Sequence, residues 1–352
     1  MDLSLRTSFV ILFGLLLGLA VSGRILAASE LPAITLDSDT FELAKKYSES
    51  VGGQTLLVMQ EGEILFEAYT NGGNKALPQT LASGTKSFLG VAAMAAVEDG
   101  LIRLDDKACE SLSEWKADPL KSQITYRQLL TLTSGFLAGE RGADLRSPAW
   151  KAVVAKPMTG GPGLQFEYGP YQLLAFAEAL QRQLKGETYE QYLTRRVLNP
   201  LGIKLEWRIR CQDGNPQVAG GGAMTARDWA TFGEFMRLEG QHQGKQIIDK
   251  ALLAECMKGT PLNPAYGLTW WLKEPVPASI IQQIPILNRD MGDLVTADWL
   301  PEDLYLAAGA GKQRLYIIPS LELVVVRQGS IKGSRQFSDA EFLSRLLRGH
   351  PT

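Results

Sequence analysis

Apolar and polar positions divide the chain into a strand-rich beginning, a helical middle and a strand-rich end. Two short apolar runs at 55–60 and 64–69 flank a Glu-Gly turn, a pattern that predicts a β-hairpin. Residues 101–257 show helical periodicity interrupted by turns, and strand-like runs return after 303. We therefore predict one antiparallel sheet built from both ends of the chain, with a mainly helical region inserted between them.

The individual elements follow from the same periodicities. A polar helix is expected at 39–50, and an Ala-rich, almost wholly apolar helix is expected to begin at Ser83 and to end before Gly100. Further helices are predicted at 126–133, 171–184, 189–197 and 226–239. Further strands are predicted at 304–306, 313–318 and 323–327. The segment between 261 and 303 is predicted to consist of Trp- and Pro-rich loops.

The first thirty residues have the pattern of an export signal. Arg6 precedes an uncharged apolar run at 9–21, and small residues follow at 27–29. This run is shorter than the about 20 residues that cross a bilayer and matches the apolar core of a signal peptide, about 7–15 residues. We expect a signal peptide at 1–28 and export to the periplasm. An uncleaved N-terminal membrane tether is the alternative.

Composition excludes several classes of function. The 352 residues carry 36 Lys+Arg against 38 Asp+Glu, so no basic excess indicates a nucleic-acid partner. The two histidines, His242 in a Gln/Gly-rich stretch and His350 near the C-terminus, argue against a Ser-His-Asp triad and a His-rich metal site. Cys109, Cys211 and Cys256 lack CxxC spacing, which excludes a Cys-based zinc site. One disulfide with a spare thiol and three buried thiols both remain open.

The residues that suggest chemistry are Ser83-Gly-Thr-Lys86. On a helix, residues i and i+3 share a face with Cβ atoms about 5–6 Å apart, so the Lys86 amine can reach the Ser83 hydroxyl. Burial against the apolar helix would lower the pKa of Lys86, and a neutral amine can take the serine proton. A capping serine beside a solvated lysine explains the same four residues, so the motif alone leaves both interpretations open.

The wider sequence resembles the serine β-lactamase-related family, from about residue 51 to residue 326. This family includes class C β-lactamases, D-Ala-D-Ala peptidases, family VIII esterases and 6-aminohexanoate-oligomer hydrolases. The resemblance rests on landmarks that occur in the family's order: SGTKSF at 83–88, ITYRQLLTLTSG at 124–135, PGLQFEY at 162–168, NPLGI at 199–203, AGGGAMTARD at 219–228 and YIIPSLELVVV at 316–326.

The resemblance implies an α/β (α+β) fold of the β-lactamase/transpeptidase type. A single serine hydrolase domain would occupy 29–352, with a sheet lobe at about 39–100 and 262–347 and a helical lobe at about 101–261. Ser83 falls on the family's nucleophile, Lys86 on its lysine partner, and Tyr168 on the tyrosine that shuttles the proton. No metal ion and no organic cofactor take part in this mechanism.

Two positions depart from the family's pattern. Pro170 replaces the asparagine of the Tyr-x-Asn motif, which weakens the case for a β-lactam or peptide substrate. The third motif, usually Lys/His-Thr/Ser-Gly, aligns by spacing with 310–312, so Gly311, Lys312 and Gln313 are the candidates for this part of the site. On that alignment the Ser83 and Gln313 N–H groups form the oxyanion hole, and Lys312 is either a cation for an anionic substrate or a solvated edge lysine.

We therefore expect an exported serine hydrolase that forms an acyl-enzyme with small esters, amides or cyclic amides. A D-Ala-D-Ala peptidase or β-lactamase, and a non-catalytic ligand-binding relative, are the alternatives. The expected partner is a small-molecule substrate.

Overall fold

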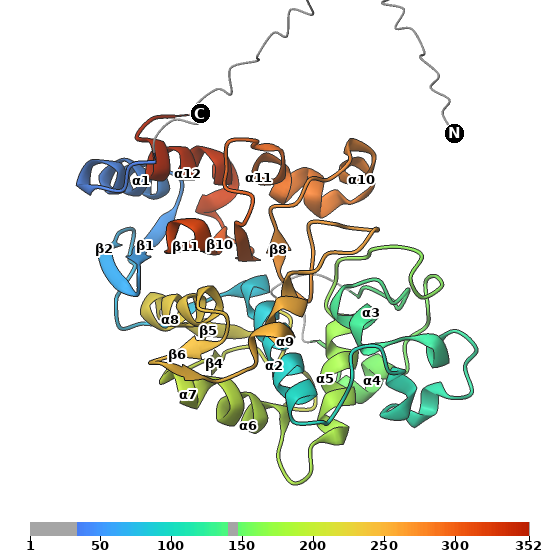
Figure 1. Cartoon of the computed structure of the whole chain (residues 1–352). Coiled ribbons are helices and arrows are strands. Elements are labelled where there is room, and N and C mark those ends of the chain that lie inside the picture. The colour runs from blue at the N-terminus through green and yellow to red at the C-terminus, as the bar shows by residue number, and fades with distance from the viewer. Residues whose placement is uncertain (1–33, 140–146, 352) are drawn as a thin grey trace, which may run out of the picture. The chain divides into compact units, whose positions relative to one another are not determined.

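A six-stranded antiparallel sheet in the order β2-β1-β11-β10-β9-β8 organises the computed structural model, which describes residues 34–139 and 147–351 (Figure 1). Its strands are β1 (Gly53–Gln60), β2 (Glu63–Tyr69), β8 (Trp271–Leu272), β9 (Tyr305–Gly309), β10 (Gln313–Ile318) and β11 (Leu323–Gly329). β1 pairs with β2 on one side and with β11 on the other. The predicted hairpin is therefore confirmed, and the sheet joins both ends of the chain as predicted. The signal peptide predicted at 1–28 lies outside the described residues.

Helices cover both faces of the sheet. They are α1 (Ser38–Ser50), α2 (Ser87–Glu98), α3 (Tyr126–Leu130), α4 (Trp150–Val154), α5 (Tyr171–Gln183), α6 (Tyr189–Leu193), α7 (Asn199–Leu201), α8 (Ala226–Arg237), α9 (Lys250–Ala254), α10 (Ala278–Gln283), α11 (Gly292–Thr296) and α12 (Asp339–Arg348). α1 and α12 pack together on one face, and α8 lies against the other (Figure 1). The α/β fold class is confirmed.

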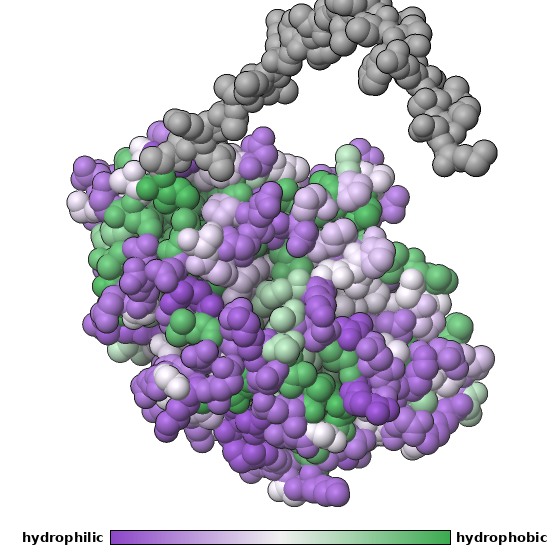
Figure 2. Space-filling model, in the orientation of Figure 1, coloured by the Kyte–Doolittle hydropathy of each residue, from purple (hydrophilic) through white to green (hydrophobic). Residues whose placement is uncertain are grey.

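Smaller strands complete the part of the chain between β2 and β8. β3 (Gln79–Thr80), β5 (Gly222–Met224) and β4 (Glu206–Trp207) form a three-stranded sheet, and β6 (Gln241–His242) pairs with β7 (Lys245–Gln246). The surface in Figure 2 is mainly hydrophilic with small, separate apolar areas, because most apolar side chains fill the interior.

Several predicted boundaries moved for local reasons. The helix predicted at 126–133 ends at Leu130, because Leu132 takes a left-handed conformation with φ 59° that no helix continues through. The helix predicted at 189–197 ends at Leu193 and passes into a π-helical turn over Thr194–Leu198. The structure also adds β8, α10 and α11 where only loops were predicted, and it extends the strand predicted at 304–306 to Gly309.

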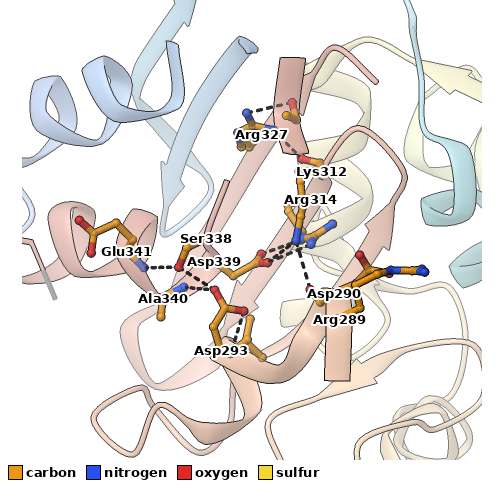
Figure 3. A network of polar contacts seen from close by, with 12 residues as sticks. Arg289, Asp290, Asp293, Lys312, Arg314, Arg327, Ser338, Asp339, Ala340 and Glu341 are labelled. Atoms are coloured by element: carbon orange, nitrogen blue, oxygen red, sulfur yellow. Dashed lines mark hydrogen bonds and ion pairs between the residues drawn. The ribbon is translucent and has the colours of Figure 1, made fainter. Parts of the chain in front are cut away.

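A buried ion pair ties α12 to the sheet (Figure 3). Arg314 on β10 donates to both carboxylate oxygens of Asp339 at 2.6 and 2.9 Å, and the Tyr316 hydroxyl donates to the same carboxylate at 2.5 Å. The exposed fraction of these side chains is 2% for Arg314 and 0% for Asp339. Burial by itself raises the pKa of Asp339, but the charge and hydrogen bonds of Arg314 lower it overall. The carboxylate therefore stays ionised inside the protein.

We expect Asp339→Asn to lower the free energy of unfolding by about 3–5 kcal/mol at pH 7, because it leaves a buried guanidinium without its counter-charge. The folded-state pKa of Asp339 lies below the unfolded value of about 3.9, so its contribution is complete above that value and is lost as the pH falls through the folded-state pKa. Urea denaturation at pH 7 and at successively lower pH should show the difference shrinking towards acid. Asp106→Asn, which removes the partner of exposed Arg103, is the control and should change little. A difference that does not change with pH would contradict this assignment.

Candidate active site

Ser83 lies on a 3-10 turn rather than on the helix that follows. The turn spans Ala82–Lys86, and α2 begins only at Ser87. Ala82 has φ 47°, a left-handed conformation that is costly for a residue with a Cβ. The Thr85 hydroxyl holds the turn, because it donates to the Ala82 carbonyl at 2.7 Å and accepts from the Gly222 N–H at 3.1 Å. The nucleophile candidate is therefore fixed against β5 by its own turn.

Lys86 is buried beside Ser83. Its exposed fraction is 4%, and its amine is 2.9 Å from the Ser83 hydroxyl oxygen and 2.6 Å from the Ala219 carbonyl oxygen. The carbonyl belongs to the Gly-rich segment at 219–222 and gives the amine a second fixed partner. The i, i+3 contact predicted from the sequence is present, and the interpretation of Lys86 as a solvated surface lysine is excluded.

Tyr168 completes the group. Its ring is almost buried, its centroid is 5.0 Å from the Lys86 amine, and it packs on Trp271 with centroids 5.7 Å apart. Pro170 follows at the cleft wall and occupies the N-cap position of α5, where the missing N–H costs no helical hydrogen bond. The structure thus brings Ser83, Lys86 and Tyr168 together, with a proline where the family has asparagine.

The residue that lies against the nucleophile turn differs from those predicted by spacing. A Cβ on Gly309, the last residue of β9, would lie 2.0 Å from the Leu81 carbonyl oxygen and 3.0 Å from the Gly84 nitrogen. Only a glycine permits β9 to approach the nucleophile turn this closely. This contact favours Ala307-Ala308-Gly309 as the counterpart of the third motif, three residues earlier than the spacing indicated, with alanines in place of its cation and hydroxyl.

The three residues predicted for this region have separate positions. Gly311 and Lys312 line the cleft, in the turn between β9 and β10. Gln313 does not line it: this side chain is buried in β10 and exchanges hydrogen bonds of 2.6 and 3.1 Å with the Gly329 backbone. The oxyanion donor predicted at the Gln313 N–H therefore stays a prediction, at a residue that is not among those lining the cleft. The residue that follows the close approach is Ala310, which lines the cleft next to Gly309.

Arg327 supports the β9–β10 turn from beneath. Its fully buried guanidinium donates to the Gly311 and Lys312 carbonyl oxygens at 3.3 and 2.8 Å, and to the Val51 carbonyl at 3.1 Å. Hydroxyl oxygens of Ser48 and Ser334 accept the remaining bonds, at 3.0 and 3.3 Å. Burial lowers the pKa of Arg327 to about 10. This side chain links the turn to α1, to Val51 directly after it, and to the segment before α12.

The candidate site opens into a cleft of about 1060 Å³. Ser83, Lys86 and Tyr168 line one part of it, and the β9–β10 turn and residues 286–293 line another. Neither His242 nor His350 is among the lining residues. A volume of this size is typical of small-molecule sites.

Other candidate chemistry lies outside this cleft. Cys109, Cys211 and Cys256 are buried free thiols, so the alternative with a disulfide is excluded. Within 34–139 and 147–351, no three His, Cys, Asp or Glu side chains are grouped as metal ligands would be. Over the same residues, no helix is long and apolar enough to cross a membrane.

Comparison with known proteins identifies relatives. A family model described as β-lactamase matches residues 41–341. A lovastatin esterase of Penicillium rubens is 28% identical over 201 residues, which are 44% of this chain and 49% of that protein, so the match spans only about half of the relative. An uncharacterised protein of Alkalihalophilus pseudofirmus is 26% identical over 82% of this chain and 88% of its own length. The solved structure of EstCE1, a hydrolase with promiscuous acyltransferase activity, has a TM-score of 0.66 at 16% identity and covers 88% of this chain and 96% of that one.

We expect Gly309→Ala to slow the reaction of Ser83 with a fluorophosphonate by about 10-fold or more, because the added methyl group forces β9 away from the nucleophile turn. The measurement is the labelling rate, followed by intact mass. Gly72→Ala is the control: its φ of 82° makes alanine unfavourable, but no atom lies within 4 Å of the added Cβ. This control should lose stability without losing labelling. Equal labelling rates for both variants would contradict the role given to Gly309.

Proposed function

The chain belongs to the β-lactamase family, and on that premise we propose that it is a serine hydrolase that cleaves small esters through an acyl-enzyme on Ser83. The observation that carries this proposal is the 2.9 Å contact between the Ser83 hydroxyl and a buried Lys86 amine at the wall of an open cleft. A hydroxyl beside a buried amine is the arrangement that activates serine without histidine.

The proposed reaction has two halves. The Ser83 oxygen attacks the substrate carbonyl carbon while a neutral Lys86 amine takes the hydroxyl proton, and the leaving group departs with a proton relayed through Tyr168. Water then attacks the acyl carbon, gives its proton back through the same groups and releases the acid. The Ser83 and Ala310 N–H groups are the proposed oxyanion donors, because Gly309 brings that end of β9 against the nucleophile turn.

Esters are favoured over amides by the residues that are missing. An amide needs its nitrogen protonated and oriented before it leaves, whereas an alcohol or phenol leaves more readily. Pro170 supplies no side-chain amide at the position where the family has asparagine, and the third motif has Ala307 and Ala308 in place of its cation and hydroxyl. The name of one similar protein, a lovastatin esterase, agrees with ester chemistry.

The same departures weigh against a D-Ala-D-Ala peptidase or β-lactamase. A non-catalytic ligand-binding protein would have no reason to bury a lysine against a cleft serine, because the burial is costly. We also propose export of the protein, supported by the apolar run at 9–21, with an N-terminal tether as the alternative if the segment is retained.

Intact-mass analysis after fluorophosphonate treatment tests the nucleophile. We expect one adduct per chain, in which the Ser83 oxygen displaces fluoride from phosphorus, and no adduct with Ser83→Ala. Lys86→Met should slow labelling and ester hydrolysis by at least about 1000-fold, because removing one member of a catalytic unit costs nearly as much activity as removing all of them. Circular dichroism of each variant checks the fold. A well-folded parent that acquires no adduct would overturn the mechanism in favour of a binding role.

The preference for esters has its own test. For a p-nitrophenyl ester and the p-nitroanilide of the same acid, we expect kcat/KM to favour the ester by at least about 100-fold. The reason is that this chain lacks the asparagine, cation and hydroxyl that would help an amide nitrogen to leave. Benzylpenicillin added before the fluorophosphonate should not protect Ser83 from labelling. Stable acylation by penicillin, seen as added mass, would favour the peptidase or β-lactamase alternative instead.

A further inference from the structure

The position of Tyr168 depends on contacts outside the catalytic group. This residue lies outside every helix and strand, in the segment that leads into α5. A group that passes a proton must stay within hydrogen-bond reach of the atom that receives it. On an irregular segment individual contacts have to fix that reach, and the residues on either side of Tyr168 are held by such contacts.

Glu167, directly before Tyr168, is held through both its backbone N–H and its carbonyl. The N–H donates to the Leu132 carbonyl at 2.9 Å, and the carbonyl accepts from the Gln172 side-chain amide at 2.8 Å. Leu132 is buried and has φ 59°, a left-handed conformation that is costly for leucine. The chain therefore takes on backbone strain at the residue whose carbonyl holds Glu167.

Gly169, directly after Tyr168, is held by close packing. A Cβ at this position would lie 2.1 Å from the Ala138 carbonyl oxygen, so the backbone fits only as glycine. The same carbonyl accepts from the Tyr171 N–H at 3.1 Å. Since the partners on both sides belong to 132–138, a single segment after α3 holds the backbone around Tyr168.

Gln172, the second residue of α5, joins this segment to the residue before Tyr168. Its side chain is fully buried, and its amide oxygen accepts from the Ser134 N–H at 3.1 Å and from the Ser134 hydroxyl at 2.6 Å. Only one orientation of the amide is possible, because an N–H can only donate and the Glu167 carbonyl can only accept. A buried amide without partners is costly, whereas an apolar side chain of the same length would fill this place at no such cost. The glutamine therefore adds a fixed link between Ser134 and the Glu167 carbonyl.

Packing of the Tyr168 ring does not replace this link. The ring centroid lies 5.7 Å from that of Trp271 and 6.1 Å from that of Tyr266. Aromatic pairs tolerate centroid separations from about 4.5 to 7 Å, whereas proton transfer needs heavy atoms within about 2.6–3.2 Å. Ring packing alone is too permissive, so the backbone contacts must set the reach of the phenol oxygen.

We propose that Gln172 is a positioning residue for the proton relay, which holds the Glu167 carbonyl so that the Tyr168 phenol stays within reach of the leaving group. This inference rests on the proposed function. Gln172 does not line the cleft, so it acts through Tyr168. In acylation the phenol gives its proton to the leaving oxygen as the C–O bond breaks, and it regains a proton from the Lys86 ammonium formed in the attack. A displaced phenol would slow leaving groups that need a proton and spare those that leave as stable anions.

The test compares two esters of one acid, p-nitrophenyl butanoate and benzyl butanoate. The p-nitrophenolate is a weak base and leaves without a proton, whereas the benzyl alkoxide must be protonated as it leaves. We compare kcat/KM, which reports acylation and excludes hydrolysis of the acyl-enzyme that both esters share. For Gln172→Met we expect kcat/KM to fall by about 10-fold or more with the benzyl ester and by about 3-fold or less with the p-nitrophenyl ester.

A double variant shows whether Gln172 acts through the tyrosine. Tyr168→Phe removes the relay itself, so Gln172→Met added to it should cause no further loss with benzyl butanoate. A glutamine that served only the stability of the fold would lower the rates with both esters alike and would add its loss to that of Tyr168→Phe.

A milder variant and a control accompany this pair. Ser134→Ala removes only the hydroxyl donor, and we expect it to lower kcat/KM for the benzyl ester alone, by about 3-fold. Gln181→Met is the matched control, because Gln181 lies on the same helix, accepts the Tyr189 N–H at 3.1 Å and does not line the cleft. The control should leave the ratio of the two rates unchanged. Circular dichroism checks each fold, and if Gln172→Met does not fold, an unchanged ratio in Ser134→Ala overturns the proposal.

The remaining outcomes separate this inference from the proposed function. Ser83-dependent turnover in which Gln172→Met affects both esters equally, affects neither, or adds its loss to that of Tyr168→Phe would overturn the positioning role and leave the hydrolase intact. Absence of Ser83-dependent turnover with both esters would overturn the hydrolase, and the role of Gln172 with it.

Discussion

The structure around the cleft depends on keeping one amine, that of Lys86, out of water. Only 4% of the Lys86 surface is exposed, so its amine needs oxygen acceptors at fixed positions. The Ser83 hydroxyl supplies one, and the Ala219 carbonyl, 133 residues after Lys86 in the chain, supplies the other. An apolar α2 provides the dry surroundings, and the Gly-rich segment provides a backbone that can come close. The proposed chemistry of the serine depends on this burial, because a solvated lysine keeps its proton and cannot take the one on the Ser83 hydroxyl.

The second constraint is the distance between β9 and the nucleophile turn. Gly309 permits contact with Leu81 and Gly84, and the β9–β10 turn beyond it is held by Arg327. The same turn carries Lys312. The close approach at Gly309 and the lysine at the cleft wall therefore belong to one strand-turn unit. A change in the anchor beneath the turn would alter the site without touching any residue in the cleft.

Much of this arrangement could be predicted from the sequence, where the signal is local. The i, i+3 spacing of Ser83 and Lys86 and the hairpin at 55–69 follow from short-range pattern, and both agree with the structure. The order of the landmarks indicated the family, which the match over 41–341 confirms. The third motif could not be placed, because Gly309 and Gly311 are both plausible by spacing. The difference between them is a contact with Leu81, a residue more than 200 positions away, and no local pattern encodes it. The π-helical turn after α6 and the short helices α10 and α11 were missed for the same reason: packing rather than periodicity determines them.

Net charge also misleads when it is summed over the whole chain. A balance of 36 cations against 38 carboxylates excludes a polyanionic partner but says nothing about how charge is distributed between the surface and one cleft. Lys312 lies in the β9–β10 turn, and Arg314 and Arg327 lie opposite one another on β10 and β11. Among the described residues, only Asp339 forms an ion pair with any of the three. Arg327 is instead held by backbone carbonyl and hydroxyl oxygens. The electrostatics of the site therefore follow from local pairing, which no sum over the chain can reveal.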